Sequence, residues 1–324
     1  MTGSIATDHL MTFPGRFADS LVVDQLDKLA LSFLVDDLEV RRGGCAANIA
    51  FGLGCLGVRP VLVGAVGEDF VDYRSWLQRH GVDCESVHVS QTRHTARFIC
   101  TTDATMAQIA SFYAGAMTEA RGIELGPIAA RVGGLDLVVV SPNDPEAMLR
   151  HTEECRQRQI PFAADPSQQL AWADGEVIRR LVDGATYLFS NDYEAALICQ
   201  KTGWDAAEVL RRVGTRVITS GAEGVHVQGG GAPALFVPAL SGVDAVDPTG
   251  VGDAFRSGFL AATGAGLSLE RAAQVGCSVA ACAVETTGTQ EYVLGRGAFI
   301  ARVEGAYGHG AAAQIGASLS FRQP

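Results

Sequence analysis

A glycine-rich segment that ends in an acid is the part of the sequence best suited to chemistry. It reads Asp247-Pro-Thr-Gly-Val-Gly-Asp253, and apolar residues at helical spacing begin directly after it. Its two glycines allow a tight turn, so the backbone amides of Gly250, Val251, Gly252 and Asp253 can converge at a helix start and bind an anion without a lysine. Asp253 could then accept a proton from a hydroxyl that attacks a phosphoryl group. The structural alternative is an acid that only stabilises the helix start.

A second glycine-rich segment, Arg42-Gly-Gly44-Cys-Ala-Ala-Asn48, precedes another helix-like stretch. Glycines at this place let a ligand approach the backbone, and Asn48 could hydrogen bond to a diol. Asp8 follows the first predicted strand, residues 3–7, where α/β proteins place ligand groups, and its carboxylate could accept from two vicinal hydroxyls. The alternatives are a glycine turn beside a buried, satisfied Asn48 and, for Asp8, a local turn.

These segments are embedded in an alternation of short apolar strands and helical stretches. Strands are predicted at residues 61–66, 135–141, 161–164, 186–190 and 216–219, and helices at 68–79, 145–159, 176–182 and 192–199. The alternation predicts an α/β fold with a doubly wound, mostly parallel sheet and crossover helices. From residue 251 onward the chain is predicted to be mostly helical.

Two stretches depart from this alternation and are predicted as antiparallel strands that form a small β-sheet lid. They cover residues 21–41 and 95–113, and the second is a hairpin of strands 97–101 and 108–112. Phe98 and Phe112 lie on its opposite strands. They either pack in the interior of the lid or offer a stacking surface for a purine.

The composition excludes several functional classes. Acidic residues outnumber Lys and Arg by 36 to 25, and the net charge of −11 disfavours nucleic acid or an anionic membrane as a partner. The lysines are Lys28 and Lys201 alone, and no G-K-[ST] sequence occurs, so a Walker A loop is excluded. No apolar run is long enough to span a membrane, and residues 1–10 show no secretory signal. The eight cysteines form no C-x-x-C pair, so we expect a cytoplasmic protein with reduced thiols.

One motif match is interpreted as packing rather than chemistry. Gly52-Leu-Gly54-Cys-Leu-Gly57 fits the dinucleotide pattern G-x-G-x-x-G. It lies within a helix-like stretch instead of between a strand and a helix start, and no acid follows at the end of the next strand. We therefore expect these glycines to allow close helix packing.

The two glycine-rich segments together closely resemble both signatures of the ribokinase-like (PfkB) carbohydrate kinase family, which phosphorylates small molecules. Asn191-Asp-Tyr-Glu194 resembles the family pattern N-x-x-E, and Thr219-Ser-Gly221-Ala-Glu-Gly224 resembles its T-x-G-x-x-G nucleotide loop. The resemblance spans nearly the whole chain in the family's order. Val251 departs from it, because the family usually has Ala or another small residue there, but its amide is still available.

Within this family, six further segments look like the bacterial adenosine kinases: residues 2–11, 31–37, 94–98, 106–113, 165–170 and 287–291. This resemblance implies a purine-salvage enzyme that carries out ATP + adenosine → ADP + AMP, a phosphotransferase with an alcohol group as acceptor. It also implies an α/β core formed by residues 1–8, 41–91 and 118–324, with a β lid formed by residues 9–40 and 92–117.

The resemblance assigns roles residue by residue. Asp253 would be the base for the 5′-hydroxyl, beside the anion hole of the Gly250, Val251 and Gly252 amides. The nucleoside would be bound by Asp8, Gly44 and Asn48 at the ribose hydroxyls, and by Ser4, Phe98, Phe112, Gln168 and Gln169 around the adenine. ATP would be bound by Asn191, Thr219, Gly221 and Gly224, with Glu194 near Mg²⁺ through water.

For Asn191 and Glu194 there is a structural alternative, because N-x-x-E before an apolar helix is also a capping box. A Glu194 engaged in capping would be poorly free to serve Mg²⁺. The resemblance further implies a monovalent cation such as K⁺ near Asp247 and Gly288, and a homodimer that pairs through the lids.

Two other functions are considered as alternatives to adenosine phosphorylation. One is a ribokinase-type sugar kinase or another nucleoside kinase of the same family. The other is a catalytically silent nucleoside-binding protein, against which the intact Asp253 and its glycine loop argue.

Overall fold

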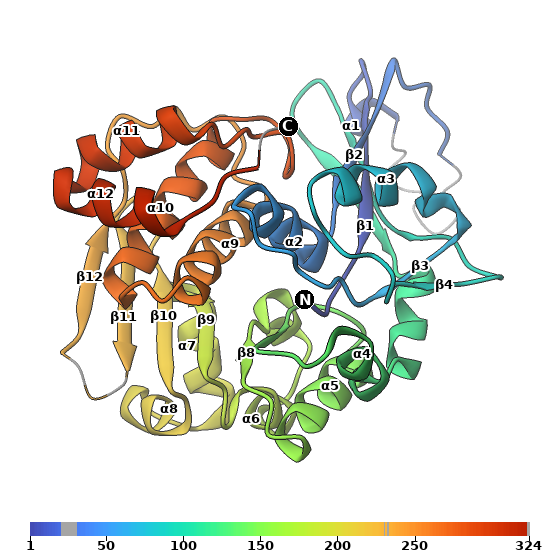
Figure 1. Cartoon of the computed structure of the whole chain (residues 1–324). Coiled ribbons are helices and arrows are strands. Elements are labelled where there is room, and N and C mark those ends of the chain that lie inside the picture. Colours follow the sequence, from blue (N-terminus) through green and yellow to red (C-terminus); the bar gives the residue numbers. More distant parts are fainter. Residues whose placement is uncertain (21–30, 230, 232, 323–324) are drawn as a thin grey trace.

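A mostly parallel six-stranded sheet forms the centre of the molecule (Figure 1). In the computed structural model, which describes residues 1–20, 31–229, 231 and 233–322, its strand order is β12-β11-β10-β9-β8-β7. Four strands pair in parallel: β7 (Val138–Val140), β8 (Phe162–Ala164), β9 (Tyr187–Asn191) and β10 (Thr215–Thr219). β11 (Gly224–Gly229) and β12 (Leu235–Pro238) extend the sheet in antiparallel fashion. The predicted strands at 135–141, 161–164, 186–190 and 216–219 are confirmed with slightly different ends.

Helices cover both faces of this sheet, because alternate strand residues point into two separate cores. Val138, Val140 and Phe162 pack in one core, while Val139 and Ala163 pack in the other. The first core is closed by α4 (Leu125–Val132), α5 (Pro145–Gln157), α6 (Gly175–Val182), α7 (Asp192–Thr202) and α8 (Ala206–Arg212). The second is closed by α2 (Cys45–Cys55), α3 (Val71–Arg79), α9 (Val251–Gly264), α10 (Leu269–Val284), α11 (Arg296–Tyr307) and α12 (His309–Ser318). The predicted doubly wound α/β fold is confirmed.

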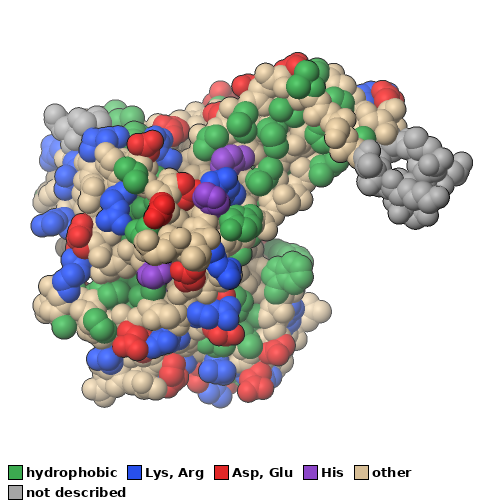
Figure 2. Space-filling model, turned by 90° about the vertical axis from the view of Figure 1, so that its right-hand side faces the viewer, with side chains coloured by type: hydrophobic (Ala, Val, Ile, Leu, Met, Phe, Trp, Pro, Cys, Tyr) green, Lys and Arg blue, Asp and Glu red, His purple; other side chains and the backbone are tan. Residues whose placement is uncertain are grey.

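A separate four-stranded sheet forms the predicted lid. Its strand order is β2-β1-β5-β6, with β1 (Ala6–Thr12), β2 (Asp37–Gly43), β5 (Ala96–Thr102) and β6 (Gln108–Tyr113). β5 and β6 pair antiparallel, which confirms the predicted hairpin. In Figure 2 this sheet extends from the main body as an arm. Of the strands predicted at 21–41, residues 21–30 lie outside the described residues, and the domain boundaries given above stay a prediction.

Short elements complete the described chain. They are α1 (Phe17–Ser20), the strands β3 (Ala65–Val66) and β4 (His88–Val89), and the 3₁₀ helices Glu68–Phe70, Gly115–Gly122 and Ser167–Ala171. No helix in the described ranges is both long and apolar enough to cross a membrane. All eight cysteines are free thiols.

The predicted first strand, residues 3–7, is wrong. The strand begins at Ala6 and belongs to the lid, because residues 6–12 pair over their whole length with both β2 and β5. Next to the central sheet, Thr2 makes an isolated bridge to Val140 of β7, and it makes another to Val63. Asp8 therefore lies inside β1 and not at a strand end. The predicted strand 61–66 is likewise reduced to β3 with isolated bridges before it.

Candidate functional site

The glycine-rich segment at 247–253 turns sharply into α9. Gly250 immediately precedes the helix with φ of 72°, and a Cβ there would lie 2.8 Å from the Thr289 Cγ2 atom, so the position favours glycine in both respects. The first turn of a helix leaves its backbone amides without helical partners, and the Val251 amide makes only a long 3.4 Å contact to the Pro248 carbonyl. The amides of residues 250–253 therefore form a suitable anion site.

Asp253 lies in this first turn and is only 9% exposed. Its Oδ2 atom accepts a 2.9 Å hydrogen bond from the Asn48 Nδ2 amide. Burial raises the pKa of Asp253 to about 6, although the Arg256 guanidinium and the Asn48 hydrogen bond lower it. A carboxylate whose pKa is close to neutral is suited to general-base chemistry.

A buried ion pair lies one helical turn beyond Asp253. Arg256 Nη2 donates to Asp165 Oδ1 at 2.6 Å, and both side chains are at most 9% exposed. Burial raises the pKa of Asp165 to about 7 against the opposing effect of Arg256. No role was predicted for either residue from the sequence. Two signals were available: Arg256 is three residues after Asp253 in an apolar helix, and Asp165 directly follows a predicted strand.

The start of α2 brings together the predicted ribose-binding residues. Gly44 has φ of 94°, and a Cβ there would lie 2.6 Å from the Ser4 carbonyl oxygen. Ser4 Oγ accepts a 3.0 Å hydrogen bond from the Cys45 amide. Burial raises the pKa of Asp8 to about 6, while Arg41 lowers it. Asn48 is buried here and projects toward Asp253.

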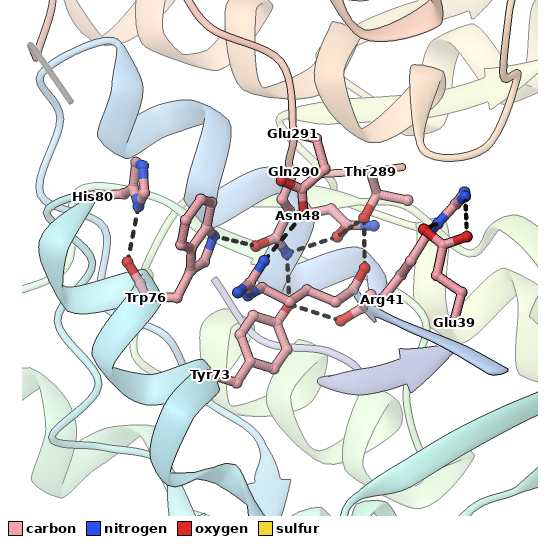
Figure 3. Close-up of polar contacts among 11 residues, drawn as sticks. Glu39, Arg41, Asn48, Tyr73, Trp76, His80, Thr289, Gln290 and Glu291 are labelled. Carbon is pink, nitrogen blue, oxygen red and sulfur yellow. Dashed lines mark hydrogen bonds and ion pairs between the residues drawn. The ribbon is translucent and has the colours of Figure 1, made fainter. Parts of the chain in front are cut away.

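Asn48 is already engaged at both ends of its amide. Besides donating to Asp253, its Oδ1 atom lies 2.9 Å from Thr289 Oγ1 and accepts a 2.9 Å bond from Gln290 Nε2 (Figure 3). The structure thus shows the buried, satisfied asparagine of the structural alternative. A role in ribose binding stays a prediction.

Four residues form a row across the lid sheet: the predicted site residues Asp8, Phe98 and Phe112, together with Arg41. Asp8 on β1 lies opposite Arg41 of β2 and Phe98 of β5, and Phe98 lies opposite Phe112 of β6. Residues directly opposite one another share a face of the sheet. Phe98 is 36% and Phe112 54% exposed, so both rings are accessible. Arg41 Nη1 lies 3.4 Å from Asp247 Oδ2, which turns this face toward the glycine-rich segment.

The two glutamines lie on the 3₁₀ helix Ser167–Ala171, which follows β8. Gln168 Nε2 is 3.8 Å from Cys45 Sγ at the start of α2. Gln169 Nε2 donates a 3.0 Å hydrogen bond to the Asn143 carbonyl. Gln168 therefore reaches the group around Gly44, whereas the Gln169 amide is held by its own loop.

The predicted ATP residues meet at the ends of two neighbouring strands. Asn191 on β9 and Thr219 on β10 are opposite in parallel register. Gly221 and Gly224 form the turn between β10 and β11, closed by a 2.8 Å bond from the Ser220 amide to the Gly224 carbonyl. Carboxyl ends of adjacent parallel strands are where α/β folds bind ligands.

Glu194 forms the capping box that was the structural alternative. The Asn191 amide donates to Glu194 Oε2, and the Glu194 amide donates to Asn191 Oδ1, each at 2.8 Å. Glu194 Oε1 is 3.3 Å from Ser167 Oγ. Within the ranges described, no group of three or more His, Cys, Asp or Glu side chains is arranged to hold a metal ion. Both carboxylate oxygens of Glu194 thus have protein partners, and its role near Mg²⁺ stays a prediction.

Comparison of this chain with known proteins identifies its family. Residues 3–294 match the pfkB family carbohydrate kinases. The chain belongs to this family. A nucleoside kinase from Methanothermobacter thermautotrophicus is 31% identical over 291 residues, which cover 89% of this chain and 92% of that protein.

Two solved structures of a nucleoside kinase from Burkholderia thailandensis are also similar. The complex with inosine is 36% identical, with a TM-score of 0.81, and the alignment covers 95% of this chain and 97% of that chain. The complex with ADP-inosine is 36% identical, with a TM-score of 0.80, and covers 95% of both chains. These similarities confirm the predicted family, fold and reaction class, a phosphotransferase with an alcohol acceptor. They do not single out adenosine.

Proposed function

We propose that this pfkB kinase is a nucleoside kinase that carries out ATP + adenosine → ADP + AMP. The observation that carries the proposal is the pairing of a buried carboxylate, Asp253, with the backbone amides of a helix start. The row of Asp8, Phe98 and Phe112 on the facing lid supports a nucleoside as acceptor, because it combines an acceptor for hydroxyls with aromatic rings. The named nucleoside kinases among its relatives agree with this.

In the proposed reaction Asp253 removes the proton of the 5′-hydroxyl as its oxygen attacks the γ-phosphorus of ATP in line. The amides of residues 250–253 stabilise the charge that develops on the transferred phosphoryl group. The Asn48 N–H group favours the ionised form of Asp253 and so keeps the base ready.

Nucleoside recognition is divided between the lid and α2. Asp8 accepts from the ribose hydroxyls beside Gly44 and Asn48. Phe98 and Phe112 stack on the base, with Ser4, Gln168 and Gln169 around its edge. Closure of the lid over the nucleoside would exclude water from the reacting hydroxyl.

The phosphate donor is ATP, bound at the β9 and β10 strand ends by Asn191, Thr219, Gly221 and Gly224. When bound, Mg²⁺ would neutralise charge on the ATP phosphates, with Glu194 as its protein neighbour through water. A K⁺ ion near Asp247 and Gly288 remains part of the proposal; Asp247 Oδ2 accepts a 2.9 Å bond from the Gly288 amide there.

The test is ADP release measured by a coupled assay with adenosine, inosine, guanosine, cytidine, ribose and fructose as acceptors. We expect kcat/KM to be highest with adenosine. A preference for inosine would retain the nucleoside kinase and overturn only adenosine, in line with the inosine complex of the relative from Burkholderia thailandensis. Turnover of ribose or fructose above every nucleoside would overturn the proposal in favour of a sugar kinase. No turnover of any acceptor would favour a silent binding protein.

A further inference from the structure

Three hydrogen-bonded side chains from distant segments, Trp76, Gln290 and Asn48, form a relay that ends at Asp253. Trp76 Nε1 donates to Gln290 Oε1 at 3.1 Å, Gln290 Nε2 donates to Asn48 Oδ1 at 2.9 Å, and Asn48 Nδ2 donates to Asp253 Oδ2 at 2.9 Å. Figure 3 shows the links among Trp76, Gln290 and Asn48. Gln290 is 1% and Asn48 5% exposed, so water cannot easily replace these partners.

Trp76 fixes the donor-to-acceptor direction of these hydrogen bonds. An indole N–H can only donate, so the group facing it must be the oxygen of the Gln290 amide. The Gln290 NH₂ group is thereby turned the other way, toward Asn48 Oδ1 and toward Tyr73 Oη at 2.5 Å. Turning the Gln290 amide over would place donor against donor at Trp76 and acceptor against acceptor at Asn48. Tyr73 in turn donates to the Gly43 carbonyl at 2.9 Å.

Gln290 then decides the orientation of Asn48. Thr289 Oγ1 is close to Asn48 Oδ1 but is also 2.8 Å from the Arg42 carbonyl. A hydroxyl has a single proton, so Thr289 can donate to the Arg42 carbonyl or to Asn48 Oδ1 but not to both at once. The Gln290 NH₂ group cannot accept a hydrogen bond, so it requires an oxygen opposite it whichever acceptor Thr289 takes, and this leaves the Asn48 NH₂ group facing Asp253.

We propose that Trp76 and Gln290 are positioning residues that orient the Asn48 amide so that its N–H group, and not its oxygen, faces the base. An N–H group there stabilises the ionised carboxylate, whereas an oxygen would favour the protonated acid. The relay acts through Asn48. It rests on the proposed function only in giving Asp253 the role of base.

Other charged groups also face Asp253, and the variants below leave all of them in place. Arg256 lies on the same helix, Glu194 on α7, and Asp165 after β8. Cys45 on α2 and Tyr292 in the segment before α11 also lie near it. A change in the titration of Asp253 therefore reports on Asn48.

The test compares Trp76→Phe and Gln290→Met with matched controls. Trp76→Phe keeps a ring against Phe51 but removes the indole donor. Gln290→Met keeps the length of the side chain but removes the amide. Trp204→Phe and Gln274→Met make the same changes at residues outside the relay; Trp204 packs against Arg179 and Arg212, and Gln274 is buried on α10. Thermal unfolding establishes that each variant is folded.

Two readouts are measured for each protein. The first is the pH profile of kcat/KM for the nucleoside, and the second is the carboxyl ¹³C titration of Asp253 in the protein without substrate. We expect Gln290→Met to move the acidic limb and the Asp253 titration upward by about one pH unit, with Trp76→Phe moving them less and with kcat/KM recovering at high pH. Both control variants should match the unmodified protein.

An unmoved Asp253 titration in folded Gln290→Met and Trp76→Phe would overturn the relay. So would a loss of kcat/KM that is equal at all pH values, since that indicates a merely structural role. If the unmodified protein phosphorylates no acceptor, the proposed function fails, and the substrate-free titration alone still decides the relay.

Discussion

At the scale of single residues, the environment of Asp253 determines when the site can work. Burial raises the pKa of this carboxyl to about 6, so below that pH the protonated form dominates and cannot accept a proton. Asp8 has a similar pKa for a similar reason, with Arg41 lowering it in part. The two acids differ in place, because Asp253 lies at the start of α9 and Asp8 lies in the lid.

We predict that kcat/KM for adenosine falls about tenfold per pH unit below about pH 6, since the base is lost as pH drops through its raised pKa. The measurement is a pH profile of initial rates. Asp8→Asn serves as the comparison: it should lower kcat/KM, but the acidic limb of its pH profile should lie at the same pH. An acidic limb near pH 4 would contradict the prediction that the base is Asp253 with a raised pKa.

The ribose hydroxyls give a second prediction at this scale. 2′-Deoxyadenosine should be the poorer substrate by about 1–3 kcal/mol in kcat/KM, because the acceptor at Asp8 is left without its partner. Side-by-side kinetics of the two nucleosides measure this difference. Equal values would reject Asp8 as a ribose-binding residue.

At the scale of elements, the β5–β6 hairpin places two aromatic rings on one face. Phe98 and Phe112 are directly opposite, and the same row contains Asp8, so a base stacked there would hold its ribose near β1. Both rings are partly exposed, which suits a binding surface better than the interior of a lid.

We predict that Phe98→Leu and Phe112→Leu each weaken adenosine binding about two- to tenfold, because Leu keeps apolar burial but loses ring stacking. ATP binding should change less. Calorimetric titration of each nucleotide or nucleoside, beside a melting curve, measures both effects. Reduced melting temperature with an unchanged adenosine Kd would instead make these residues ordinary lid packing.

The elements also show which parts of the fold the sequence could predict. The strands β7 to β9 were recognisable because each contains a short apolar run whose residues pack into both cores. β1 was assigned to the wrong residues, since residues 6–12 are largely half-buried in the lid and lack a clear apolar run. The glycines at 52 and 54 do pack closely, as expected: a Cβ at Gly54 would lie 2.0 Å from the His80 carbonyl oxygen.

The candidate site was predictable where its residues share one local segment. Asp253 and its glycine turn, or Gly44 and Asn48, can be read from neighbouring letters. Trp76 and Gln290 could not be linked in this way, because they are 214 residues apart and meet only through packing of α3 against the segment after α10. The same holds for the Asp165–Arg256 pair.

At the scale of the whole molecule, the lid sheet has a second face that turns away from the Asp8 row. Leu38, Val40, Ile109 and Tyr113 lie on it and are 44–54% exposed. Figure 2 shows hydrophobic side chains along this arm. An exposed apolar sheet face of this kind suits association with a second copy of the chain.

We therefore propose that the protein forms a homodimer through its lids. Light scattering after size-exclusion chromatography at micromolar concentration should give the mass of a dimer, and Val40→Asp should give a monomer, because a charge is costly in a buried apolar interface. A monomer for the unmodified protein would contradict this proposal.

We propose that a nucleoside bound under the lid presents its 5′-hydroxyl to Asp253, beside an anion site at the start of α9. The most direct measurement is AMP formation from ATP and adenosine by the unmodified protein and by Asp253→Asn, with adenosine binding measured for both. We predict that the unmodified protein forms AMP, and that the variant binds adenosine nearly as well but has a kcat lower by about 10² to 10⁴. No AMP from the unmodified protein, or a near-normal kcat in the variant, would contradict it.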